Sequence, residues 1–154
     1  MARYTTRVHD RLILPAQVCL PRGREQLLRM LHRRVPDPVI VQLLIDTGST
    51  RSSLLPSVLA GLNPEQSGVA RLETSLAAAE ATLFRVRLEF PHTKLEAIPE
   101  LLVALAPLPP SLSAFHGVIG RDLLRQWESF CYQGRRGRLS IRDRRSWLLR
   151  WITP

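Results

Sequence analysis

The feature that most constrains this chain is an apolar run that ends abruptly in an acid. Residues 39–45 contain one polar side chain, Gln42, and this composition predicts a strand buried on both faces. Asp46 follows where that strand would emerge, and a carboxylate there costs free energy unless it is hydrogen-bonded or functional. Two hydroxyl residues and a glycine suited to a tight turn come next: Thr47, Gly48 and Ser49.

The length and composition indicate one globular domain. The chain has 154 residues, of which 45% are hydrophobic and 23% are charged, and this is enough for a real core. We therefore expect a single domain over residues 1–154, with a loose polar arm at 1–11 and an apolar tail at 146–154. No apolar run is long enough to span a membrane.

The charge is strongly basic, with 22 Lys and Arg against 13 acids and a net charge of +9. Such a balance is compatible with a nucleic-acid or anionic-membrane partner, or with a solvated surface rich in arginine. We favour the solvated surface, because the basic residues are scattered and the one cluster, at 135–145, has no aromatic RNA-binding signature. We expect no nucleic-acid partner. Contact of the 146–154 tail with a membrane surface remains an alternative that we do not favour.

The cysteines and histidines point to neither a disulfide framework nor a metal site. Cys19 and Cys131 are the only cysteines, and no Cys/His spacing suggests zinc. We expect no metal and no cofactor, and a cytoplasmic protein with free thiols.

Most of the remaining segments read as strands. Residues 12–20, 52–55 and 101–106 are short apolar or extended stretches, and 84–90 alternates strictly between apolar and polar. We interpret residues 69–90 as a long hairpin with its tip near Ala77–Glu80, although the alanines leave a helix over 75–81 as an alternative.

Three segments show helical patterns, and one further segment reads as a hairpin. Residues 22–34 predict a short amphipathic helix, with a long hairpin loop as the alternative, and 56–62 predict one or two helical turns. Residues 121–128 predict a helix whose apolar residues share a face. Alternating strands on either side of a Gly-Arg-Arg-Gly sequence predict a second hairpin over residues 130–141.

A second motif lies at residues 117–124, Gly-Val-Ile-Gly-Arg-Asp-Leu-Leu. Val118 and Ile119 form a short apolar strand between two glycines, and a helix follows. By itself this is compatible with an ordinary strand-to-helix turn in which glycines allow tight packing.

Together the two motifs resemble the retropepsin-like, retroviral-type aspartic proteases. Asp46-Thr47-Gly48 after an apolar strand resembles the active-site signature of aspartic proteases, and residues 117–124 resemble the downstream glycine-rich element of the retroviral type. A flap hairpin separates the two elements in that family, as 69–90 would here. The resemblance covers about residues 12–142 and suggests a bacterial or other non-viral member. It implies a mainly β, closed-barrel-like acid protease fold with one short C-terminal helix, and allows a helical insertion at 22–34.

The resemblance also implies an activity, an aspartic endopeptidase that needs two carboxylates. The chain has one Asp-Thr-Gly, so it implies a homodimer with Asp46 from each subunit, acting on a peptide or protein substrate. In this comparison the 146–154 tail would supply an interface strand. The alternative is a non-catalytic interaction module, monomeric or dimeric, on the same fold.

Roles for other residues follow from the same resemblance. Thr47, Gly48 and Ser49 would support the active-site loop. A substrate-binding flap would be formed by Ser75, Leu76, Ala77, Ala78 and Ala79. Structural support would come from Gly117, Val118, Ile119, Gly120, Arg121 and Asp122.

The sequence departs from the retroviral pattern in three places, one of which is the insertion at 22–38, longer than the usual first hairpin loop. Ser49 and Thr50 stand where retroviral enzymes usually carry alanine and an acid that pairs with the helix arginine, so Arg121 needs another partner. The expected flap tip also lacks the glycines common in retroviral flaps.

Overall fold

The computed structural model describes residues 3–8, 11–73 and 78–143, and within them the chain is mainly β. The strands are β1 (Arg3–Arg7), β2 (Ile13–Cys19), β3 (Val39–Ile45), β4 (Ser53–Leu54), β5 (Gln66–Glu73), β6 (Ala78–Glu89), β7 (Ile98–Leu105), β8 (Gly117–Ile119), β9 (Ser129–Gln133) and β10 (Arg138–Arg142). The helices are α1 (Arg22–Met30), α2 (Pro56–Leu62) and α3 (Arg121–Leu124), with 3-10 turns η1 (Pro110–Leu112) and η2 (Gly134–Arg136).

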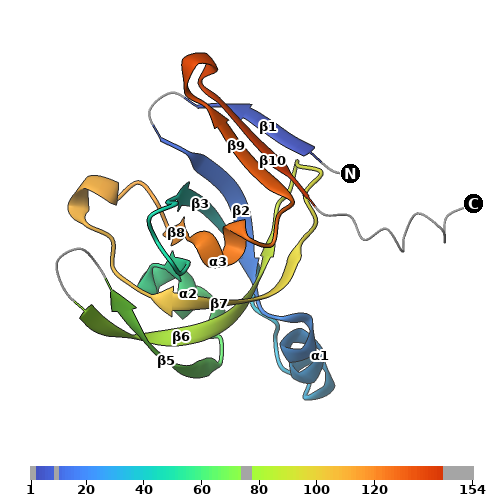
Figure 1. Cartoon of the computed structure of the whole chain (residues 1–154). Helices are drawn as coiled ribbons and strands as arrows, with labels where there is room; N and C mark the ends of the chain where they lie inside the picture. Colours follow the sequence, from blue (N-terminus) through green and yellow to red (C-terminus); the bar gives the residue numbers. More distant parts are fainter. Residues whose placement is uncertain (1–2, 9–10, 74–77, 144–154) are drawn as a thin grey trace, which may run out of the picture.

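Six strands close into a barrel, as the sequence predicted (Figure 1). Their order is β2-β3-β8-β4-β7-β6, and β6 pairs again with β2, while β5 extends the sheet as the outer strand of a hairpin with β6. The β3–β8 and β4–β7 pairs are parallel, and the neighbouring pairs are antiparallel. Closure hides the edges of these six strands, which removes the risk of edge-to-edge aggregation.

The strand β3 is buried on one face, so the prediction of burial on both faces was wrong. Val41, Leu43 and Ile45 point into the core, whereas Ile40 is 71% exposed and Gln42 is also exposed. A barrel wall has one face toward the core and one toward the outside, and only a covering layer buries the outer face. An apolar run cannot reveal whether such a layer exists.

A separate three-stranded sheet has the order β1-β10-β9. The hairpin prediction for 130–141 is confirmed by β9 and β10, and Gly137 closes the turn with a φ of +52°, which a side chain rarely tolerates. The loose arm expected at 1–11 is wrong over Arg3–Arg7, because these residues form β1 and pair along the whole of β10. Their polar side chains gave no apolar signal of a strand. The tail 146–154 lies outside the described residues.

The hairpin predicted at 69–90 is confirmed by the antiparallel pairing of β5 with β6. The alternative helix over 75–81 is wrong where the structure describes it, since residues 78–81 belong to β6. The helix α2 is also confirmed, with Pro56 in its first turn and Asn63 ending it in a left-handed conformation.

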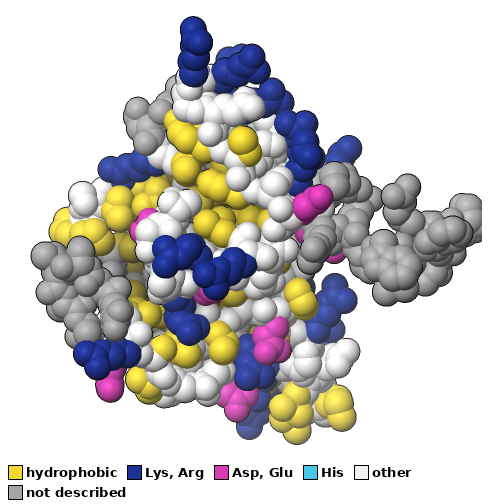
Figure 2. Space-filling model, viewed as in Figure 1, with side chains coloured by type: hydrophobic (Ala, Val, Ile, Leu, Met, Phe, Trp, Pro, Cys, Tyr) yellow, Lys and Arg dark blue, Asp and Glu magenta, His cyan; other side chains and the backbone are white. Residues whose placement is uncertain are grey.

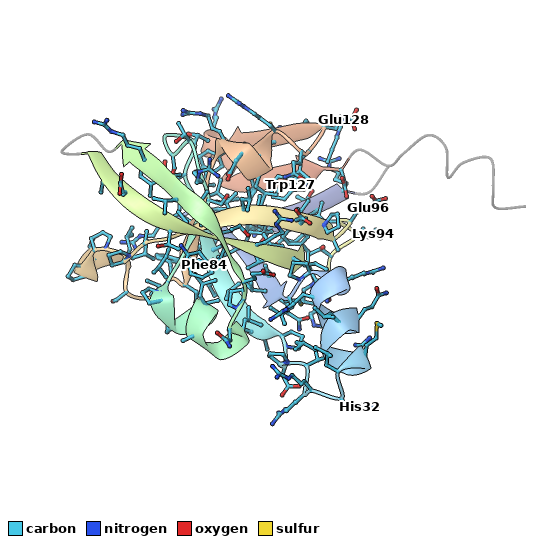
Figure 3. The ribbon with its side chains drawn as sticks, turned by 90° about the horizontal axis from the view of Figure 1, so that it is seen from below. His32, Phe84, Lys94, Glu96, Trp127 and Glu128 are labelled. Carbon is cyan, nitrogen blue, oxygen red and sulfur yellow. The ribbon has the colours of Figure 1, made fainter. Side chains whose placement is uncertain are left out.

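The insertion between β2 and β3 is helical, as predicted, over Arg22–Met30. Figure 3 shows this helix beside the barrel, with His32 at its outer end. It buries no residue completely, and an ion pair helps to attach it: Glu25 on α1 pairs with the buried Arg87 on β6, which also pairs with Glu89. Burial beside this cluster raises the pKa of the Cys19 thiol to about 11.

The helix after the second motif is shorter than predicted. Regular α-helix ends at Leu124 instead of continuing to Glu128, and the next bonds run three residues back, from Gln126 N to Leu123 O. The chain must turn here to enter β9 at Ser129. Trp127 is nevertheless buried, as its apolar character suggested, and packs edge-on against Phe90. Within 3–8, 11–73 and 78–143 no helix has the length and apolar character to cross a membrane.

Candidate active site

The pairing of β3 with β8 places Asp46 at the end of a barrel strand. Ile45 lies opposite Ile119 in the ladder, and the Asp46 N–H donates to the Ile119 carbonyl at 3.0 Å. The side chain of Asp46 is exposed. Its carboxylate therefore projects from a rigid strand end without being drawn into the core.

Gly48 holds the Asp46 carboxylate in place. The Gly48 N–H donates to Asp46 Oδ1 at 2.8 Å. A Cβ on Gly48 would stand 3.1 Å from the same oxygen, closer than most real contacts. The backbone of Asp46-Thr47-Gly48 thus turns so that the Gly48 N–H meets the Asp46 carboxylate. The missing side chain of Gly48 permits this close contact.

Arg121 of the second motif, residues 117–124, supports this loop by hydrogen bonds. The Arg121 backbone N–H donates to Ser49 O at 2.9 Å, and its guanidinium donates from Nη1 to Thr47 O at 2.8 Å and Gly48 O at 3.2 Å. Arg121 therefore binds two loop carbonyls in place of the acid that the loop lacks.

Asp122 makes a second, more buried connection to the loop through Ser52. The Ser52 N–H lies 2.9 Å from both carboxylate oxygens of Asp122, and the Ser52 hydroxyl donates to Oδ1 at 2.7 Å. The same hydroxyl accepts the Gly120 N–H at 3.0 Å. Ser52 is only 3% exposed, and these bonds satisfy its buried N–H and hydroxyl together with the buried Gly120 N–H.

The two glycines of the second motif allow the segments to touch. A Cβ on Gly117 would lie 2.3 Å from Ser53 O, and one on Gly120 would lie 2.5 Å from the Arg51 carbonyl carbon. Neither backbone could remain in place. Between the glycines, Ile119 is 1% exposed in the core.

The structure thus brings together the residues predicted for the loop and for its support. It does not test the flap: Ser75, Leu76 and Ala77 lie outside the described residues, and Ala78 and Ala79 are the first residues of β6. Sequence reasoning missed Ser52, because a serine between two strands carries no signal of a contact 70 residues away.

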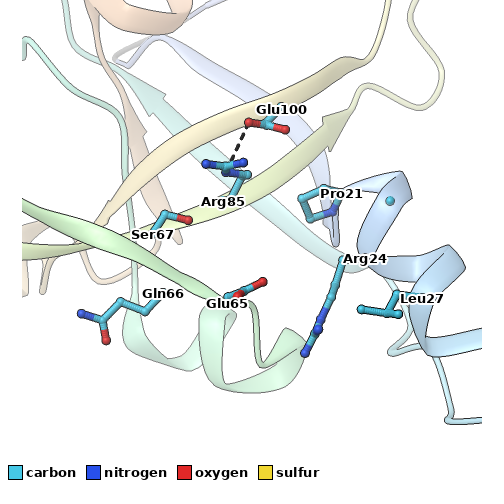
Figure 4. Close-up of a pocket in the computed structure, with 9 residues that line it drawn as sticks. Pro21, Arg24, Leu27, Glu65, Gln66, Ser67, Arg85 and Glu100 are labelled. Atoms are coloured by element: carbon cyan, nitrogen blue, oxygen red, sulfur yellow. Dashed lines mark ion pairs between the residues drawn. The ribbon is translucent and has the colours of Figure 1, made fainter. Parts of the chain in front are cut away.

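One pocket of the described chain lies elsewhere, between α1 and the start of β5 (Figure 4). It contains the Arg85–Glu100 ion pair at 3.2 Å, with Arg24 and Glu65 opposite. No residue of the 46–52 loop lines it, so the candidate site does not depend on this pocket. Over the described ranges, no three His, Cys, Asp or Glu side chains form a group that could hold a metal ion.

The described part of the chain presents one exposed acid, Asp46, on the loop that follows β3. The exposed carboxylate of Asp46 can accept a proton or a hydrogen bond, but it cannot by itself both activate a water and protonate a carbonyl oxygen.

Comparison with known proteins bears on the fold. No protein-family model and no curated protein matches the chain. Among solved structures, the chain is similar to a retropepsin-like aspartic protease from Rickettsia conorii, with a TM-score of 0.56 and 10% identity over 90% of this chain and 89% of that one. The EIAV protease complexed with the inhibitor HBY-793 also matches, with a TM-score of 0.49 and 15% identity over 79% and 92% of the two chains. The chain therefore has the retropepsin-like fold that its motifs predicted.

Proposed function

We propose that this chain is an aspartic endopeptidase that works as a homodimer, with Asp46 from each subunit at the twofold axis. The observation that carries the proposal is the exposed Asp46 carboxylate, held by Gly48 and placed at the end of a barrel strand in a retropepsin-like fold. The two loop carbonyls bound by Arg121 support it, because they fix the loop on a rigid element.

The chemistry of the pair follows from charge repulsion. Two carboxylates about 3 Å apart cannot both ionise readily, so they share one proton. The ionised member accepts a proton from a bound water, whose oxygen then attacks the peptide carbonyl carbon. The protonated member hydrogen-bonds to the carbonyl oxygen and supports the tetrahedral intermediate. Transfer of a proton to the amide nitrogen then allows the C–N bond to break.

Each element of the site would have a part in this reaction. Gly48 has no side chain of its own, which would leave room for a substrate backbone beside the loop. Thr47 would face its counterpart across the axis. The β5–β6 hairpin would cover the bound peptide as the flap, with its tip at residues 75–79.

The test is a cleavage assay with a peptide library at pH 4 to 7. Asp46→Asn keeps the shape of the side chain but removes the ionisable group, so we expect cleavage to fall by roughly 10²–10⁴-fold. Asp37→Asn is the matched control, because Asp37 is also exposed, pairs with Arg34 at the surface, and precedes β3. Its activity should equal that of the unaltered chain. Substantial cleavage by Asp46→Asn would contradict the proposal.

The second candidate is a non-catalytic interaction module on the same fold. It is favoured by the single Asp-Thr-Gly of the sequence, because a chain that never pairs has one Asp46 carboxylate without a second beside it. Sedimentation at micromolar concentration is the first test: a strict monomer cannot bring two Asp46 carboxylates together and leaves only the module. A dimer is compatible with both candidates, and the cleavage assay with Asp46→Asn then separates them.

A further inference from the structure

The β1-β10-β9 sheet gathers arginines from the two ends of the chain. In the register of β1 with β10, Arg3 lies opposite Arg142 and Arg7 lies opposite Arg138. Directly paired residues share a face of the sheet. The contact from Arg3 Nε to the Ser140 hydroxyl, at 3.0 Å, agrees with that placement.

We call the outward side of this sheet the basic face. Its members alternate with buried residues such as Leu139 and Ile141. They are Arg3, Thr5, Arg7, Arg138, Ser140, Arg142, Ser129, Cys131 and Gln133. Two more exposed arginines, Arg135 and Arg136, stand in the turn at its end, and Figure 2 shows basic side chains gathered along this upper end of the molecule.

The four arginines of the basic face have no acid among them. In the part of the chain that the structure describes, none of the four forms an ion pair. The nearest acids along the strands, Glu128 and Asp143, lie just beyond the strand ends, and Asp143 is buried with its carboxylate bound to the Glu96 N–H. Like charges placed directly opposite each other destabilise a sheet. The arrangement therefore works against folding and is suited to an anionic partner.

We propose that the basic face binds the phosphate backbone of double-stranded nucleic acid without sequence preference. Guanidinium groups bind phosphate oxygens with two parallel hydrogen bonds, and hydroxyl and amide groups such as Thr5, Ser140 and Gln133 are common phosphate partners. The two opposed arginine pairs are four residues apart, about 13 Å along the strands. That distance is close to the width of a DNA major groove, about 12 Å.

The other residues of the basic face favour a duplex over other polyanions. The face has no aromatic side chain on which single-stranded bases could stack, and no aliphatic side chain that could enter a bilayer. Its nine members stand on the surface of a sheet and not on a helix that could enter the major groove, so sequence recognition is not expected.

This inference goes beyond the proposed protease and does not depend on it. The basic face belongs to a different sheet from β3, which carries Asp46. It also replaces the expectation that no nucleic acid is bound. That expectation depended in part on the scatter of arginines along the sequence, whereas the pairing of β1 with β10 brings four of them together on one face.

The experiment measures binding of a fluorescently labelled 24-base-pair DNA duplex by anisotropy, from 25 to 200 mM salt. Contact with about four phosphates predicts a slope of log K against log salt of about −3.6. In the double variant Arg7→Gln/Arg138→Gln we expect the slope to fall to about −1.8 and the affinity at 50 mM salt to drop at least tenfold. The variant removes an opposed like-charge pair, so its melting temperature should not decrease.

The matched control is Arg22→Gln/Arg33→Gln, which makes the same change in net charge at two exposed residues of the α1 insertion. Its binding should stay within threefold of the unaltered chain. Three results would overturn the proposal: no duplex binding at 25 mM salt, an equal loss in both double variants, or binding to phosphatidylserine vesicles or polyglutamate in place of the duplex.

Discussion

Ser52 shows how much of the site depends on one buried hydroxyl. It connects the Asp46 loop to the second motif by donating to Asp122 and accepting from Gly120. In Ser52→Ala, the Gly120 N–H and one Asp122 oxygen lose this partner in a buried place. We expect the free energy of unfolding to fall by roughly 1–3 kcal/mol, measured by urea denaturation.

The control for this variant is Ser57→Ala on α2. Ser57 is exposed, so its loss should change the free energy of unfolding by no more than about 0.5 kcal/mol. If the two variants have equal stability, the Ser52 connection does not contribute to the fold as described.

At the scale of elements, α1 illustrates a helix attached by charge more than by apolar packing. Leu28 packs partly against the core, but Leu27 is 42% exposed, and Met30 and Leu31 are more exposed still. Glu25 binds the guanidinium of Arg87, whose side chain is 9% exposed, and Arg87 also donates to the Leu20 carbonyl. A buried cation of this kind needs its partners, because an unpaired buried charge is costly.

The Glu25 carboxylate forms a buried ion pair with Arg87 and an exposed one with Arg29. Two variants of α1 test these two ion pairs separately. Glu25→Gln weakens the pair with Arg87, and we expect a loss of roughly 1–3 kcal/mol in the free energy of unfolding. Arg29→Gln removes only the surface contact of 3.9 Å to Glu25, so a change below about 0.5 kcal/mol is expected. If the denaturation curves of the two variants coincide, the pair of Glu25 with Arg87 does not attach the helix.

At the scale of the whole molecule, the proposed activity depends on a second copy of the chain. Equal amounts of unaltered and Asp46→Asn subunits, mixed until they exchange, form dimers in a 1:2:1 ratio, and only dimers with two intact acids should cleave. The activity should be about one quarter of that given by the same total amount of unaltered protein. A monomeric enzyme would give half, and this outcome would exclude the shared site.

Local patterns predicted most of the elements. Strict alternation over 84–90 located β6, and Pro56 in a short apolar segment located α2. The same patterns failed where neighbours decide the outcome. Arg3–Arg7 forms a strand because its backbone pairs with that of β10. The helix α3 ends early because the chain has to turn into β9.

The sequence by itself determined the chemistry of the site: one acid at the end of an apolar strand, a glycine beside it, and a second glycine-rich motif far along the chain. These are properties of residue type and order, and they are present before folding. Only the tertiary structure decided that Arg121 binds the Thr47 and Gly48 carbonyls, that Ser52 meets Asp122, and that arginines from both ends share one face. Those contacts join residues about 70 to 140 positions apart, and no local periodicity encodes which distant strands will pair.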